Sequence, residues 1–163
     1  MKIYTDGSKF ESQCGTGFAI YAGKRIITKH SERLPDESTV FQAEVRGIQK
    51  AAETMLNSEN LSKYKYIKIF TDSQATLLAL NSADVTSKLV LQTKLALNEL
   101  AKKTCRVTIV WIKAHVGHEG NELADELAKE GTKKKLLTSS IGIPHNNIKA
   151  LTCLLYTSDA ADE

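Results

Sequence analysis

Three β-rich segments follow one another at the start of the chain, before any helical pattern appears. Residues 2–5 alternate apolar and polar side chains, and Gly15 to Ala22 and Arg25 to Glu32 are two further strand-like runs. Turn signals stand after the first run and between the other two, at Asp6-Gly7 and at Gly23-Lys24. Because short connections join antiparallel neighbours, this order predicts an antiparallel meander of three strands.

Helical and strand patterns alternate after this meander. A capping residue, Ser38 or Thr39, precedes a helix whose apolar side chains recur at spacings of four and three residues: Phe41, Val45, Ile48, Ala52 and Met55. The later patterns predict a strand, two helices, a strand and a last helix, at 66–71, 73–80, about 89–103, 106–112 and 121–133. Strands separated by helices add in parallel. We therefore expect an α/β fold with a five-stranded mixed sheet, the meander plus parallel strands, and helices on both faces.

Composition narrows the class of protein. The 163 residues fit one domain, and the net charge of +3 favours a polyanionic partner only weakly. The three cysteines, Cys14, Cys105 and Cys153, have no metal-ligand spacing and indicate reduced thiols. We find no signal peptide and no apolar run near the ~20 residues that span a membrane. We expect an intracellular monomer, in the cytoplasm or nucleus, that is neither secreted nor membrane-bound.

Four acidic residues are the candidates for chemistry: Asp6, Glu44, Asp72 and Asp125. Each has an ordinary structural explanation, since Asp-Gly pairs make turns, Asp-Ser pairs cap helices, and helical acids are usually solvated. Their positions in the predicted fold favour a shared site, because Asp6 and Asp72 end neighbouring strands and ligands bind at that edge. Four clustered carboxylates repel one another unless a cation neutralises them. Carboxylate oxygens are ligands that magnesium prefers, so the pattern predicts a metal site.

His115 follows the strand at 106–112 and precedes the last helix, which places it on a loop. A loop histidine beside a metal site can move a proton to a leaving oxygen. The alternative is a solvated loop residue.

Together these segments resemble type 1 ribonuclease H. The resemblance rests on T-D-G-S, Q-A-E, T-D-S-Q and A-H-x-G-x-x-G-N-E-x-x-D in this order, over roughly Lys2 to Gly131. It implies a ribonuclease H-like fold and cleavage of the RNA strand in RNA–DNA hybrids, with 5′-phosphate and 3′-hydroxyl products. It also implies two Mg²⁺ ions, which Mn²⁺ can replace, held by the four acidic residues, with His115 as a mobile helper. Substrate contacts are implied for four further residues: Gly7, Ser8, Thr39 and Gln74.

Within this family the sequence is most similar to the ribonuclease H domain of non-LTR retrotransposon reverse transcriptases, and this similarity implies a covalently linked polymerase domain before Met1. A host-domesticated or free-standing ribonuclease H stays open as the alternative. One departure is the short, non-basic segment at 79–86, where bacterial members carry a basic insertion that grips the hybrid. The hybrid must then be bound by other cations, such as Lys24, Arg25, Lys29 and residues 133–135, or by the polymerase domain. We expect weak, salt-sensitive binding of the hybrid by the isolated chain. Two alternatives stay open: an inactive hybrid-binding module, and an integrase- or transposase-like nuclease of the same fold.

The predicted domain organisation has three parts. Residues 1–135 form the ribonuclease H domain, and residues 136–152 form a C-terminal linker segment. Residues 153–163 resemble a translated sequencing adapter, and we expect them to be disordered.

Overall fold

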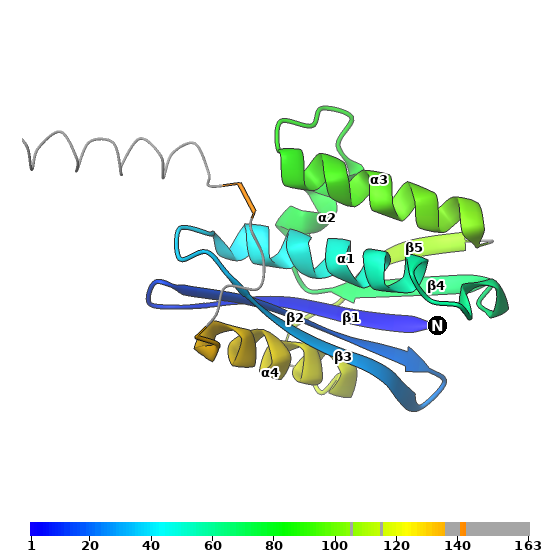
Figure 1. Ribbon diagram of the computed structural model, residues 1–163, viewed down its shortest axis with the longest axis horizontal. Helices are drawn as coiled ribbons and strands as arrows, with labels where there is room; N and C mark the ends of the chain where they lie inside the picture. Colours follow the sequence, from blue (N-terminus) through cyan, green and yellow to red (C-terminus); the bar gives the residue numbers. More distant parts are fainter. Residues whose placement is uncertain (105, 115, 136–140, 143–163) are drawn as a thin grey trace, which may run out of the picture.

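A five-stranded sheet forms the centre of the computed structural model, which describes residues 1–104, 106–114, 116–135 and 141–142 (Figure 1). The strands are β1 (Lys2–Phe10), β2 (Gln13–Ala22), β3 (Arg25–Leu34), β4 (Tyr66–Thr71) and β5 (Arg106–Trp111). The helices are α1 (Val40–Leu56), α2 (Gln74–Asn81), α3 (Lys88–Lys103) and α4 (Glu119–Lys133), with a short 3-10 helix η1 (Leu61–Lys63). The sheet order is β3-β2-β1-β4-β5.

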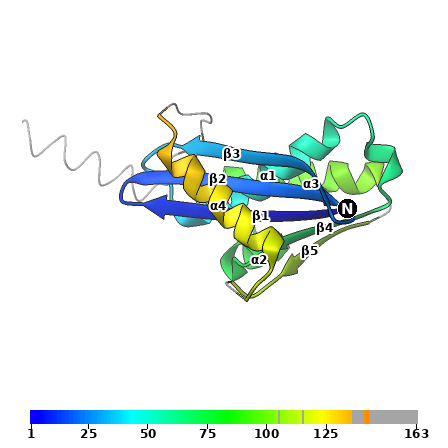
Figure 2. The same cartoon turned by 90° about the horizontal axis from the view of Figure 1, so that it is seen from below.

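The mixed sheet that the sequence predicts is confirmed. Strands β1, β2 and β3 pair antiparallel, while β4 pairs parallel with β1 and with β5. Helices α1, α2 and α3 lie on one side of the sheet, and α4 lies across β1, β2 and β3 on the other side (Figures 1 and 2). The fold class is therefore as expected, with helices on both faces.

The predicted turn at Asp6-Gly7 is wrong. Strand β1 continues through both residues to Phe10, and Asp6 and Gly7 pair with Gly17 and Thr16 of β2. The chain reverses at Glu11-Ser12, where Glu11 has a φ of +53°. A long ladder with β2 overrides the local turn preference of Asp-Gly, because each further pair adds backbone hydrogen bonds.

Helix α1 begins where the sequence predicts and buries the predicted stripe. Thr39 is its N-cap and forms a capping box with Gln42. Val45, Ile48, Ala52 and Met55 are buried, and Phe41 packs partly buried against the same core. Ser73 caps α2, and Ser87 caps α3, which ends in the predicted Lys102-Lys103.

The main core lies between the sheet and the α1–α3 layer. Its largest fully buried apolar side chains are Ile3, Phe18, Ile20, Ile48, Ile67, Ile69 and Leu100. Cys14, Leu34 and Ala43 form a second cluster, against which Ile141 packs. Among the described residues no helix is long and apolar enough to cross a membrane. The adapter-like segment 153–163 lies outside the described residues.

Candidate metal centre

The candidate centre forms where β1 and β4 stop pairing. These two strands pair only over Lys2–Tyr4 and Lys68–Phe70. Asp6 follows two residues later on β1, and Asp72 comes directly after β4. Beyond the paired part, Glu44 of α1 can reach both. Carboxylate oxygens of Asp6, Glu44 and Asp72 lie within 4.8 Å of one another, so three of the four predicted acids converge.

Gly7 allows this convergence. A Cβ atom at Gly7 would lie 2.6 Å from the Glu44 backbone nitrogen and 2.9 Å from the Ala43 carbonyl carbon. Only glycine permits so close an approach of β1 and α1. The backbone N–H of Gly7 also donates to Asp6 Oδ1 at 2.7 Å.

Burial and mutual repulsion disfavour the charged forms of the carboxyl groups in this cluster. Burial, and next the charge of Asp72, raises the pKa of Asp6 to about 7, although hydrogen bonds from Glu44 and the Gly7 N–H oppose the shift. Burial also raises the pKa of Glu44 well above its usual value, and the charges of Asp6 and Asp72 add to this. Glu44 Oε2 is buried and has no hydrogen-bond partner. A buried carboxylate oxygen without a donor, inside a cluster of like charges, fits a divalent cation with oxygen ligands.

Two side chains that sequence reasoning did not single out hold Asp72 in place. The Asn121 amide Nδ2 donates to Asp72 Oδ2 at 3.0 Å, and the Trp111 indole Nε1 donates to the Asp72 carbonyl at 2.9 Å. Asn121 is buried, and its Oδ1 has no hydrogen-bond partner. The sequence signal for Asn121 is its place in the segment A-H-x-G-x-x-G-N-E-x-x-D, at the start of the predicted last helix.

Asp125 lies outside the three-carboxylate cluster. Its Oδ2 accepts from Lys129 Nζ at 2.6 Å, one helical turn further along α4. Its charge nevertheless contributes to the raised pKa of Asp6, so it lies near enough to act on the same cluster.

The remaining predicted site residues with described positions lie on β1, at the start of α1 and at the start of α2. The Thr39 hydroxyl accepts from the Gln42 N–H as part of the α1 cap. Ser8 is half-buried on β1, and Gln74 is exposed at the first position of α2. His115 lies outside the described residues.

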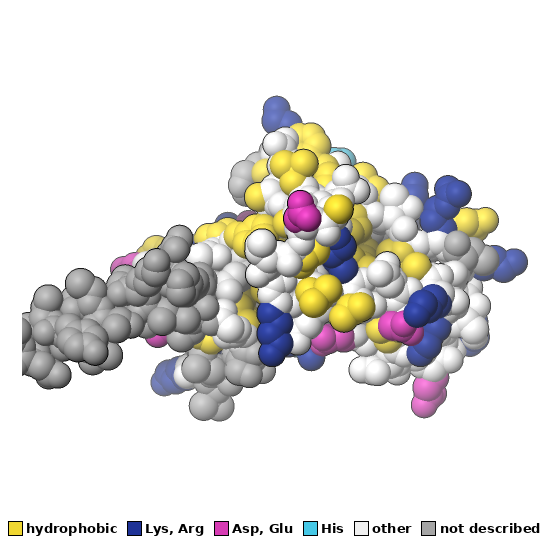
Figure 3. Space-filling view, turned by 90° about the horizontal axis from the view of Figure 1, so that it is seen from above, with side chains coloured by type: hydrophobic (Ala, Val, Ile, Leu, Met, Phe, Trp, Pro, Cys, Tyr) yellow, Lys and Arg dark blue, Asp and Glu magenta, His cyan; other side chains and the backbone are white. Residues whose placement is uncertain are grey.

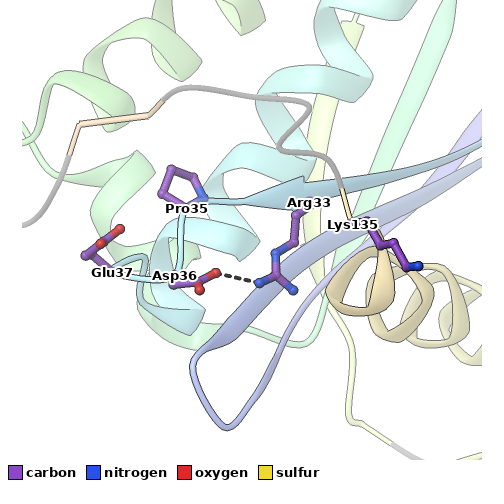
Figure 4. Close-up of a pocket in the computed structure, with 5 residues that line it drawn as sticks. All are labelled: Arg33, Pro35, Asp36, Glu37 and Lys135. Atoms are coloured by element: carbon purple, nitrogen blue, oxygen red, sulfur yellow. Dashed lines mark hydrogen bonds and ion pairs between the residues drawn. The ribbon is translucent and has the colours of Figure 1, made fainter.

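A cavity of about 280 Å³ lies apart from these carboxylates (Figure 4). Its lining consists of Arg33, Pro35, Asp36, Glu37 and Lys135, where β3 ends and α4 has just finished. The Arg33 guanidinium forms an ion pair with Asp36 and donates to the Thr132 carbonyl. The cavity contains none of the predicted site residues.

Comparison with known proteins agrees with this arrangement. The family model described as RNase H matches residues 1–133. The chain is 31% identical to ribonuclease H1 of Rattus norvegicus over 147 residues, which cover 81% of this chain and 50% of that protein. It is 28% identical to ribonuclease H of Pseudoalteromonas translucida over 153 residues, which cover 87% of this chain and 96% of the relative. The chain thus spans about half the length of its rodent relatives and nearly all of the bacterial one.

Two solved structures share the fold. RNase H1 from the archaeon Halobacterium salinarum superposes with a TM-score of 0.63 at 22% identity, over 80% of this chain and 95% of the other. The native prototype foamy virus protease–reverse transcriptase superposes with a TM-score of 0.65 at 21% identity, over 82% of this chain and 21% of the viral chain. The chain belongs to the RNase H family.

Proposed function

We propose that this chain hydrolyses the RNA strand of RNA–DNA hybrids with the help of two divalent metal ions. The observation that carries the proposal is the buried cluster of Asp6, Glu44 and Asp72, with its unpaired Glu44 oxygen, in a chain of the RNase H family. These three residues, with Asp125 beside them, would hold the ions. Bound Mg²⁺, or Mn²⁺ in its place, would supply an activated water and charge stabilisation at the departing 3′-oxygen. The products would carry 5′-phosphate and 3′-hydroxyl ends.

The chain's own residues prepare the centre in two ways. Asn121 and Trp111 restrain the side chain and backbone of Asp72, so that its carboxylate is held before any ligand arrives. Lys129 neutralises Asp125, which reduces repulsion towards the other acids until a cation competes for them.

Substrate selection would depend on the 2′-hydroxyl group, which distinguishes RNA from DNA. We propose that Gly7 and Ser8 approach the RNA strand, that Gln74 contacts the minor groove, and that Thr39 contacts a DNA phosphate. His115 would move a proton near the leaving oxygen. Two solved structures of the same fold support a nucleic-acid substrate: the foamy viral protease–reverse transcriptase has been solved with double-stranded DNA and with an RNA/DNA hybrid.

We further propose that the domain comprises residues 1–135 and works beside a reverse transcriptase, as in non-LTR retrotransposons. Support comes from the viral fold relative, in which the matched part is about a fifth of a longer chain. Residues 136–152 would then be a linker, and residues 153–163 a translated adapter.

The first experiment incubates the full chain with a labelled RNA–DNA hybrid, with and without Mg²⁺, beside Asp72→Asn. The matched control is Asp84→Asn, which removes an exposed carboxylate between α2 and α3. We expect cleavage of the RNA strand that requires Mg²⁺, survives in Asp84→Asn and is lost in Asp72→Asn.

Other outcomes would contradict the proposal. Hybrid binding by a folded parent protein without cleavage would indicate the inactive binding module instead. Joining of matched DNA ends would favour the integrase-like alternative.

A further inference from the structure

One side of β4 and β5 is left without a covering helix. Helix α4 packs on β1, β2 and β3 and does not cover the same side of β4 and β5 (Figure 2). On that side Tyr66, Lys68, Arg106 and Thr108 are exposed, whereas Phe70 and Val110 further along the strands are half-buried. We call this surface the open face, and it consists of Lys2, Tyr66, Lys68, Arg106 and Thr108. Alternation along the strands assigns it, because Ile67 and Ile69 between these residues are buried in the core on the α1 side.

The open face carries unpaired positive charge. Lys2 and Lys68 are direct neighbours on paired strands, and Arg106 pairs with Tyr66. Among the described residues, none of these three cations forms an ion pair with a carboxylate. Like charges on neighbouring strands are destabilising, so their juxtaposition costs stability unless an anion lies across them.

More cations surround the same end of the sheet, where β1, β4 and β5 begin and α3 finishes: Lys24, Arg25, Lys63, Lys65, Lys102 and Lys103. Lys and Arg side chains gather at this end on the right of Figure 3. Glu99 neutralises Lys102 there, but the balance is strongly positive in a chain whose net charge is only +3.

The open face leads directly to the candidate metal centre. Side chains at alternate positions share one side of a strand, so Tyr66, Lys68 and Phe70 of β4 point the same way and Asp72 follows them. The four steps along the chain from Lys68 to Asp72 span roughly 13 Å. Tyr4 and Phe70 stack between the two ends, with ring centroids 4.7 Å apart.

We propose that the open face binds a single nucleic-acid strand that continues from the hybrid held at Asp6 and Asp72, an inference that rests on the proposed function. Lys2, Lys68 and Arg106 would contact successive phosphates, and the exposed ring of Tyr66, 62% accessible, would stack on a base. Two strands present a strip about 10 Å wide, which suits one strand with its bases stacked flat rather than a duplex. The open face is mostly cationic rather than apolar, so it favours a phosphate backbone over a protein partner, whose interface would need an apolar core.

The test measures fluorescence anisotropy of labelled hybrids with the full chain in EDTA, so that nothing is cleaved. One hybrid is blunt, and two others carry a single-stranded DNA extension of about ten nucleotides at one end or the other. The double variant Lys68→Gln/Arg106→Gln removes two charges from the open face. The control Lys88→Gln/Lys94→Gln removes two charges from α3, on the opposite side of the sheet.

We expect one of the two extensions to tighten binding by about tenfold, and the open-face variant to abolish this gain while the control keeps it. The slope of log affinity against log salt for the extended hybrid should fall by about 1.4 in the open-face variant. Tyr66→Ala should weaken the gain without changing charge, which gives a second test that does not depend on the double variant. Mg²⁺-dependent cleavage of the blunt hybrid, measured separately, should be the same in all four proteins.

Three results would overturn the inference. The extensions could add no affinity in the parent protein, or the open-face variant could weaken blunt and extended hybrids equally. Displacement of the extended strand by poly-glutamate as readily as by single-stranded DNA would indicate an acidic protein partner instead. Failure of the proposed function would differ from all three, because the blunt hybrid would then remain uncut in the presence of Mg²⁺.

Discussion

Asn121 and Asp72 are joined by a hydrogen bond of 3.0 Å from the Asn121 amide to the Asp72 carboxylate, across 49 positions of the chain. Asn121 lies in the first turn of α4 and Asp72 directly follows β4, so the bond ties the last helix to the candidate metal centre. Because Asn121 is buried, its amide cannot hydrogen-bond to water instead if the carboxylate moves away. The orientation of Asp72 is therefore set by the docking of α4.

The first prediction concerns this tether. Asn121→Ala should weaken Mn²⁺ binding by about 10- to 100-fold, the usual effect of losing a residue that orients a metal ligand. Isothermal titration calorimetry measures this without relying on activity. Asn98→Ala, at an exposed position of α3, is the matched control and should bind as the parent protein does. Equal affinities for Asn121→Ala and the parent would show that α4 does not orient Asp72.

The second prediction uses Trp111 as a built-in reporter. It is the only tryptophan in the chain, and its indole N–H donates to the carbonyl of Asp72. We expect Mg²⁺ or Mn²⁺ to change its fluorescence, because binding at Asp72 alters the field at the indole. The change should disappear in Asp72→Asn and persist in Asp84→Asn. If the fluorescence of the parent protein does not change at saturating metal, Trp111 does not sense metal binding at Asp72.

The third prediction is a pH dependence of stability in EDTA. The folded-state pKa of Asp6 is raised to about 7, mainly by burial, so folding favours its protonated form. The resulting stabilisation is fully present below pH ~4, the unfolded-state value, and is lost as pH rises through 7. The free energy of unfolding should fall by about 2–3 kcal/mol more between pH 5 and 8 in the parent than in Asp6→Asn.

Mg²⁺ should reverse this loss, because a cation offsets the repulsion that deprotonation creates. Thermal or urea denaturation at each pH, with and without Mg²⁺, measures both effects. Metal should raise the melting temperature more at pH 8 than at pH 5 in the parent, and little at either pH in Asp6→Asn. If the free energy of unfolding changes with pH equally in the parent and in Asp6→Asn, the pKa of Asp6 is not raised in the folded state.

The fourth prediction concerns the close packing of α4 on the sheet. A Cβ atom at Gly17 would lie 2.4 Å from the Ala128 backbone nitrogen, and backbone cannot move aside as a side chain can. Gly17→Ala should therefore destabilise the protein by at least about 1–3 kcal/mol, the usual cost of overpacking. It should also weaken metal binding, because α4 carries Asn121 and Asp125. Gly142→Ala, where a Cβ atom meets nothing within 4 Å, is the control and should leave the stability unchanged.

Much of the fold was predictable because its signals are local. The capping residue Thr39, the apolar stripe of α1 and the β-rich runs act over a few positions, and each formed the expected element. Asp6-Gly7 shows the limit of such signals. The pair favours a turn locally, but pairing with Gly17 and Thr16 of β2 extends the strand through it.

The sequence by itself determined the order of strands and helices and the places of the four acidic residues along it. Tertiary structure alone decided how these residues meet: Asp6, Glu44 and Asp72 converge where β1 and β4 part, while Asp125 lies outside the cluster. It also decided that Asn121 and Trp111 hold Asp72. The physical reason is range. Propensity and capping depend on neighbours a few residues away. These contacts instead arise because α1 and α4 pack on the sheet and β5 pairs with β4.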